Sequence, residues 1–351
     1  MLVSRSLALG ALFGLSVVTL SATAHAEPRG PVAAQICSVG AAAVGQPGTL
    51  ICKDTVTGAT TQSIPLGATV SGAGGIANSL ASRDVRVLVT NQVGGAALFR
   101  LVDGRLTTPV MLQTDGESSL SGALSERGAY VLTPTTLRFY PRGHTTASSA
   151  RPLLLGDGSA AAVTLTEHVA YVSEKNGSLE AFALGYDGRL GPATPVAGIS
   201  PGVIVGITGL DRTVVAPIAH LASNFAQAEI AVAQRAAQIQ RVPTKEVAAC
   251  WASSDDGEAC VTNPGSMTIS CGAVGDAGLL SYTSAAASLP GESVFDLDMW
   301  QGLVGVQGVH GGKPVLLTFR RTAGDFLSLL GEVPTDTTVA AGALLLPGMS
   351  R

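Results

Sequence analysis

Apolar and polar residues alternate in two short runs within residues 168–195. The runs occupy positions 169–172 and 179–184. An Asn-Gly pair at 176–177 separates them, and an Asp-Gly pair at 187–188 follows the second run. Alternation with a period of two predicts half-buried strands, and these dipeptides favour tight turns with positive φ. The stretch therefore predicts consecutive antiparallel strands joined by hairpins.

The same pattern recurs along the chain at intervals of 41 to 46 residues. A period of this length, with about four short strands in each unit, is typical of the blades of a β-propeller. A weaker unit precedes the others at residues 36–52. The middle strands of the six clearer units lie at residues 88–90, 130–132, 171–173, 214–216, 260–262 and 305–307.

The two ends of the array predict how it closes. Residues 339–345 form one apolar strand with no partner strand after it, and the first unit has no clear strand before Ile36. A blade buries its faces only against its neighbours, so the array has to close on itself. We therefore expect an all-β, seven-bladed propeller, closed by the C-terminal strand, as a single domain over residues 27–351.

One segment, residues 226–240, is rich in strong helix formers and is also compatible with an exposed helix. The repeat instead requires a strand near residues 229–233. Propensity alone is a weak guide that tertiary context overrides. We favour the strand.

The N-terminus indicates export. Residues 1–26 combine a positive start, an apolar run and a small-x-small cleavage site at 24–26, as in a signal peptide. We expect a periplasmic or secreted monomer without membrane insertion, because no apolar run is long enough to span a bilayer. Loss of Arg5 with the signal peptide makes the net charge −5, against −4 for the full chain. This mild acidity predicts no nucleic-acid partner.

Five cysteines follow the signal peptide, in a compartment that permits disulfides. Cys37 and Cys52 fall on neighbouring strands of the first unit, and Cys260 and Cys271 on neighbouring strands of the sixth, so we predict these two pairs. Cys250 lies close enough to compete for Cys260, and its pairing stays open. No metal-ligand spacing accompanies the cysteines, and we expect neither a metal nor a cofactor.

Three stretches resemble the lactonase-type seven-bladed propellers, which include 6-phosphogluconolactonase and the carboxymuconate cyclases. They are Tyr171-Val172-Ser173-Glu174 with the following Asp187-Gly188-Arg189-Leu190, then Val89-Thr90-Asn91, and finally residues 249–270, ACWASSDDGEACVTNPGSMTIS. The resemblance implies the propeller fold and an exported bacterial member of the group. It also implies that an active enzyme would carry His, Arg and Glu around one mouth of the central channel.

The expected inner strands depart from that implied site. None of those that the repeat places carries a His or an Arg, and the nearest family-like run, residues 141–144, contains an extra Gly. We therefore carry over no catalytic residue. The inner strands expected are residues 121–124, 160–163, 205–207, 249–252, 294–297 and 342–344.

Three residues are candidates for the channel. Asp296 and Asp298 alternate on one expected inner strand, so both carboxyl groups can face the channel as a cation site or an acid–base pair. Either one could instead bond a neighbouring strand. Trp251 lines the channel or packs between blades. The run at 198–202 matches a nucleophile motif, but Pro201 lacks the N–H that an oxyanion hole needs.

These observations leave three functions. The first is an exported propeller that binds a small molecule or another exported protein and lacks the catalytic residues of the family. The second is a lactonase-type hydrolase or cyclase with a rearranged site around Asp296, Asp298 and loop histidines. The third is a structural role in an envelope or matrix assembly. The missing catalytic residues favour the first.

Overall fold

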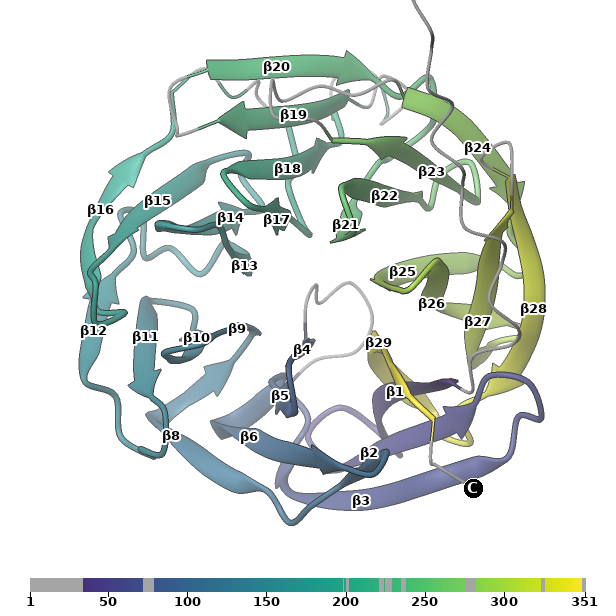
Figure 1. Cartoon of the computed structure of the whole chain (residues 1–351), viewed down its shortest axis with the longest axis horizontal. Coiled ribbons are helices and arrows are strands. Elements are labelled where there is room, and N and C mark those ends of the chain that lie inside the picture. The colour runs from purple at the N-terminus through teal and green to yellow at the C-terminus, as the bar shows by residue number, and fades with distance from the viewer. Residues whose placement is uncertain are drawn as a thin grey trace, which may run out of the picture. The chain divides into compact units, whose positions relative to one another are not determined.

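The computed structural model describes residues 34–348 except 72–78, 198, 200–201, 221–223, 225–228, 235–237, 275–281 and 323–325. The predicted signal peptide, residues 1–26, lies outside this range. All regular elements described are strands, and they form seven antiparallel sheets arranged as blades around a central axis (Figure 1). The predicted all-β, seven-bladed propeller is confirmed.

Each blade contains four strands in order from the axis outwards, with one extra short strand, β7, in the second blade. Blade 1 combines β29 (Val339–Pro347), β1 (Ala34–Ala41), β2 (Pro47–Asp54) and β3 (Thr60–Thr69). Blade 2 holds β4 (Leu80–Arg83), β5 (Arg86–Val89), β6 (Gln92–Val102), β7 (Arg105–Leu106) and β8 (Val110–Ser119). Blade 3 holds β9 (Ser121–Ser125), β10 (Gly128–Leu132), β11 (Thr136–Pro141) and β12 (Ser149–Pro152).

The remaining four blades follow in chain order. Blade 4 holds β13 (Ala160–Leu165), β14 (Val169–Glu174), β15 (Leu179–Leu184) and β16 (Leu190–Pro195). Blade 5 holds β17 (Thr208–Leu210), β18 (Thr213–Ile218), β19 (Glu229–Gln234) and β20 (Gln238–Pro243). Blade 6 holds β21 (Trp251–Asp255), β22 (Glu258–Asn263), β23 (Thr268–Ala273) and β24 (Tyr282–Ser288). Blade 7 holds β25 (Ser293–Trp300), β26 (Leu303–His310), β27 (Lys313–Thr322) and β28 (Phe326–Pro334).

Pairing of β29 with β1 closes the ring, as predicted. The two strands run antiparallel, with Cys37 opposite Leu344 and Ala34 opposite Pro347. The last strand of the chain thereby becomes the inner strand of the first blade. Each inner strand also contacts the inner strands of both flanking blades, so β29 joins β25 to β4 around the axis.

Hydroxyl groups at the ends of the second strands bind the next blade in the same way three times. Thr90 Oγ1 donates to the carbonyl of Leu120 at 3.3 Å, and Ser173 Oγ donates to that of Val205 at 2.9 Å. Thr262 Oγ1 donates to the carbonyl of Phe295 at 3.1 Å. A repeated polar seam therefore supplements the apolar packing between blades.

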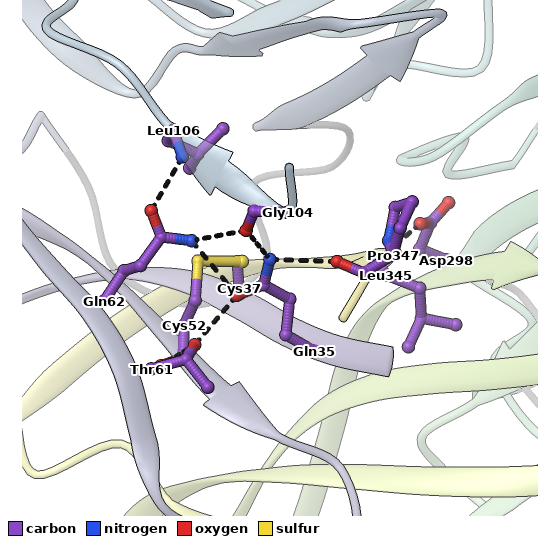
Figure 2. The surroundings of a disulfide bond; sticks show 10 residues. All are labelled: Gln35, Cys37, Cys52, Thr61, Gln62, Gly104, Leu106, Asp298, Leu345 and Pro347. Atoms are coloured by element: carbon purple, nitrogen blue, oxygen red, sulfur yellow. Dashed lines mark hydrogen bonds between the residues drawn. A yellow bond between two sulfur atoms is a disulfide. The ribbon is translucent and has the colours of Figure 1, made fainter. Parts of the chain in front are cut away.

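A buried glutamine joins blades 1 and 2 at the closure (Figure 2). Gln35 is 1% exposed, and its Nε2 donates to the carbonyls of Gly104 at 2.7 Å and Pro347 at 3.1 Å. Its Oε1 accepts from Thr61 Oγ1 at 2.8 Å and from Gln62 Nε2 at 3.1 Å. One side chain thus fixes the end of the closing strand to the neighbouring blade.

Both predicted disulfides are present. Cys37–Cys52 links β1 to β2, and Cys260–Cys271 links β22 to β23, each between directly opposite residues. Cys250 forms no disulfide, and burial raises the pKa of its thiol to about 12. The pairing of Cys250, which the sequence left open, is therefore decided: this cysteine stays outside both disulfides.

The strand predicted within residues 226–240 is confirmed as β19, which pairs with β18 and β20. The inner strand expected at 205–207 is wrong, because β17 begins at Thr208. Residues 198, 200 and 201 of the nucleophile-like motif lie outside the described residues. No helix in the described parts of the chain is long and apolar enough to cross a membrane.

We predict that Gln35→Ala destabilises the protein by about 2–4 kcal/mol, because it removes four hydrogen bonds of a buried side chain. Urea unfolding followed by circular dichroism measures this loss. Gln113→Ala is the matched control, since Gln113 is exposed on an outer strand and should change stability by less than about 0.5 kcal/mol. Equal effects of the two substitutions would contradict the bridging role of Gln35.

Candidate functional site

A cavity of about 480 Å³ opens at one mouth of the central channel. It is lined from all seven blades, mostly by residues of the inner strands. In blades 2 to 7, this end of the channel lies beside the turns that lead from the inner strand to the second strand. The residues that bring charge or an aromatic ring to the cavity wall are Arg83, Asp84, Asp255, Asp296, Asp298 and Trp300.

Asp298 ties the cavity wall to the closing strand. Its Oδ2 accepts the backbone N–H of Leu345 on β29 at 2.8 Å, a pair drawn in Figure 2. Its Oδ1 accepts the hydroxyl of Ser253 on β21 at 3.3 Å. Burial raises the pKa of Asp298 from its ordinary value of 3.8 to about 7, and the nearby Asp255 adds to the rise. Asp298 therefore bridges blades 6, 7 and 1 while holding its proton unusually tightly.

Asp296 lies two residues earlier on β25 and is 1% exposed. A β-bulge lies between Val294 and Leu297, where the register with β26 shifts. Asp296 Oδ1 accepts the backbone N–H of Leu297 at 3.1 Å. The structure thus brings both predicted aspartates to the same cavity wall, each already accepting backbone hydrogen bonds.

Serine and threonine hydroxyls continue this network through blades 5 and 6. Ser253 Oγ accepts the N–H of Met299 at 3.2 Å. Ser254 Oγ lies 2.7 Å from Thr208 Oγ1, which joins blade 6 to blade 5. Asp255 Oδ2 accepts the N–H of Gln301 at 2.6 Å. The polar groups of the wall therefore bind neighbouring strands, and they fix the shape of the mouth.

Arg83 is the residue that the sequence did not reveal. It ends β4, a strand of four residues that was too short to recognise by alternation, so the absence of arginine from the inner strands does not extend to blade 2. Its side chain is 46% exposed, and Nη2 lies 3.5 Å from Oε1 of Glu126 on the next blade. The neighbouring Asp84 has a φ of 56° and forms the turn. Arg83 is thus paired with Glu126 at the rim of the cavity.

Trp251 is placed in the core. It is 5% exposed and stacks edge-on against Phe295, with ring centroids 5.7 Å apart. It packs within the apolar cluster that joins blades 4 to 7, and it is not among the residues lining the cavity. The four residues that follow it, 252–255, line the cavity instead. Trp300 is the indole at this mouth.

The described histidines lie elsewhere. None of His144, His168, His220 and His310 lines the cavity. His310 Nδ1 lies 2.7 Å from Glu332 Oε1, and His168 Nε2 lies 3.4 Å from Glu167 Oε1, both near the surface. Among the described residues, no group of three or more His, Cys, Asp or Glu side chains is arranged to hold a metal ion.

Comparison with known proteins identifies the fold. Neither a family model nor a curated protein matches the sequence. The periplasmic gluconolactonase PpgL of Pseudomonas aeruginosa is 12% identical, with a TM-score of 0.59 over 89% of this chain and 99% of that chain. A Bacteroides fragilis protein, provisionally named a 6-phosphogluconolactonase, is 13% identical, with a TM-score of 0.63 over 91% and 100%.

A functionally unknown protein of Desulfotomaculum acetoxidans is 16% identical, with a TM-score of 0.63 over 90% of this chain and 99% of that chain. At these identities the likeness establishes architecture and leaves chemistry to the residues themselves. The chain therefore has the propeller fold of these lactonase-type structures.

We predict that Asp298→Asn changes how stability depends on pH. Because folding raises the pKa of Asp298, its contribution to stability is fully present below about pH 4 and is lost as the pH rises through about 7. The variant has no such contribution to lose. Its free energy of unfolding, relative to that of the wild type, should therefore rise by up to about 4 kcal/mol between pH 4 and pH 8. Urea titrations across that range measure it.

Asp103→Asn provides the control for this titration. Asp103 is exposed in a turn and has a φ of 49°, a conformation that asparagine also adopts readily. Its difference from wild type should stay constant across the same pH range. A constant difference for Asp298→Asn as well would show that Asp298 titrates normally.

Proposed function

We propose that the protein is an exported binding module that takes a small polar ligand into the cavity at the channel mouth. One observation carries the proposal: the carboxyl groups of Asp255 and Asp298 accept backbone N–H bonds from neighbouring blades, and that of Asp296 accepts the N–H of Leu297 on its own strand. Groups used in this way form a preorganised wall, whereas catalysis requires them to meet a nucleophile or a leaving group. The volume of about 480 Å³ suits a small molecule.

The charges on the wall favour a neutral or cationic ligand. Four aspartates line the cavity with a single arginine, and the recorded partner of Arg83 is Glu126 at the rim. The resulting negative potential disfavours anionic compounds such as sugar phosphates. Trp300 supplies an aromatic surface against which a sugar ring or an alkylammonium group can pack.

Export is part of the proposal. The signal-peptide pattern of residues 1–26 and the two disulfides both support a periplasmic or secreted protein. PpgL, which shares the fold, is named as periplasmic.

A second candidate function is a lactonase-type hydrolase or cyclase with a rearranged site. It is favoured by one observation: Asp296, Asp298 and Arg83 line the same cavity. A carboxyl group whose pKa is raised to about 7 is also suited to general acid–base catalysis near neutral pH. The histidines, however, lie outside the cavity.

We predict that the purified mature protein binds neutral or cationic probes and does not bind sugar phosphates. Isothermal titration calorimetry with glucose, methyl glucoside, putrescine and glucose 6-phosphate tests this preference for neutral or cationic ligands. Asp255→Asn should weaken the binding of a cationic probe about tenfold, since it removes one charge from the wall. Asp256→Asn is the matched control, because Asp256 adjoins Asp255 but does not line the cavity.

A lactone-hydrolysis panel separates the two functions. The binding proposal expects no turnover above the uncatalysed rate with aldonolactones or their phosphates. Turnover that is abolished by Asp296→Ala, in a variant that remains folded, would overturn it in favour of the enzyme. Tight binding of glucose 6-phosphate would overturn the assigned ligand charge.

A further inference from the structure

Two buried glutamates lie side by side in blade 4, at the end of the channel opposite the cavity. Glu174 on β14 and Glu180 on β15 are each 1% exposed. Glu180 stands directly opposite Val172, two residues before Glu174 on the same face of the strand. The carboxyl groups are therefore diagonal cross-strand neighbours, and each adds to the cost of ionising the other.

The pair holds the connection between blades 3 and 4, residues 153–159, at both ends. Near its start, the N–H of Leu154 donates to both oxygens of Glu180, at 2.9 and 3.1 Å. At its end, Ser159 Oγ donates to Glu174 Oε2 at 2.7 Å. Between these points Leu154 and Leu155 are each 49% exposed. The buried carboxyl groups thus hold this connection in place, together with backbone bonds from Leu153 to Thr135 and from Lys175 to Ser159.

No cation balances the pair. Oε1 of Glu174 is buried without a hydrogen-bond partner in the described structure. The charged groups that act on Glu174 are Glu180 from β15 and Asp157 from the connection, and both are acidic. Lys175, in the turn after β14, is exposed. An ionised Glu174 would therefore be a buried charge with one hydroxyl to stabilise it.

We infer that Glu174 and Glu180 form a proton-dependent latch, which holds residues 153–159 against blade 4 when Glu174 is protonated and releases them when it ionises. Burial and the neighbouring acids raise the pKa of Glu174 to about 7, and burial also raises that of Glu180. The latch is therefore closed in mild acid, where Glu174 is protonated, and it opens as the pH rises through neutrality. Opening lets the carboxylates reach water and exposes the backbone around Leu154 and Leu155.

Hydrogen exchange followed by mass spectrometry tests the latch on the full mature chain. We expect the amides of Leu154 and Leu155, corrected for intrinsic exchange, to lose protection on the order of tenfold per pH unit above pH 7. Glu174→Gln keeps the shape and stays neutral, so its protection should not change between pH 5.5 and 8.5. Asp187→Asn is the control, because Asp187 is exposed in the turn after β15 and is not one of the acids that act on Glu174, so the wild-type response should stay intact.

Two results would overturn the latch: protection in the wild type that does not change with pH, or an identical loss in Glu174→Gln. If that variant fails to fold, carboxyl carbon-13 NMR of the wild type decides the question. A Glu174 resonance that titrates near neutrality, together with a shift at Leu154, supports the latch. A Glu174 that titrates near its ordinary value of 4.5 contradicts it.

Discussion

The pairing of β29 with β1 is the constraint on which the rest of the molecule depends. A four-stranded blade has two apolar faces and cannot bury either of them alone, so seven blades are stable only as a closed ring. Closure here rests on one antiparallel strand pair, on Gln35 beneath it and on Asp298 beside it. A carboxyl group in the channel mouth is therefore also part of the closure, because Leu345 of the closing strand donates to it.

These bonds between strands explain why the channel mouth is polar. The inner strands of neighbouring blades run alongside one another, and their exposed N–H groups need acceptors. Asp255 and Asp298 accept such groups from neighbouring blades, with Ser253 as an additional acceptor, and Asp296 accepts the N–H of the next residue on its own strand. Their carboxyl groups are consequently held in fixed positions.

The architecture could be predicted from the sequence because its signal is repeated. The period of 41 to 46 residues defined the blades, the unpartnered strand at 339–345 predicted closure, and hairpin geometry paired the cysteines. The same period correctly favoured a strand over a helix at β19. Arg83 was missed because β4 has only four residues, too few for alternation to be recognised. The Glu174–Glu180 pair was missed because only the cross-strand register brings the two residues together.

Burial raises the pKa of two acids, Asp298 and Glu174, to about 7. For each, the structure has to explain why a carboxyl group is buried where a neutral amide would cost less. The two carboxyl oxygens of Asp298 accept hydrogen bonds from two donors on adjoining blades. An asparagine has only one side-chain oxygen, so its NH2 group would face one of these donors. Glu174 differs, because its one bond, from Ser159, could equally be accepted by a glutamine. A carboxyl group at that position adds only the capacity to ionise. Its presence in a buried, cation-free environment is therefore accounted for by a response to pH, and packing alone does not account for it.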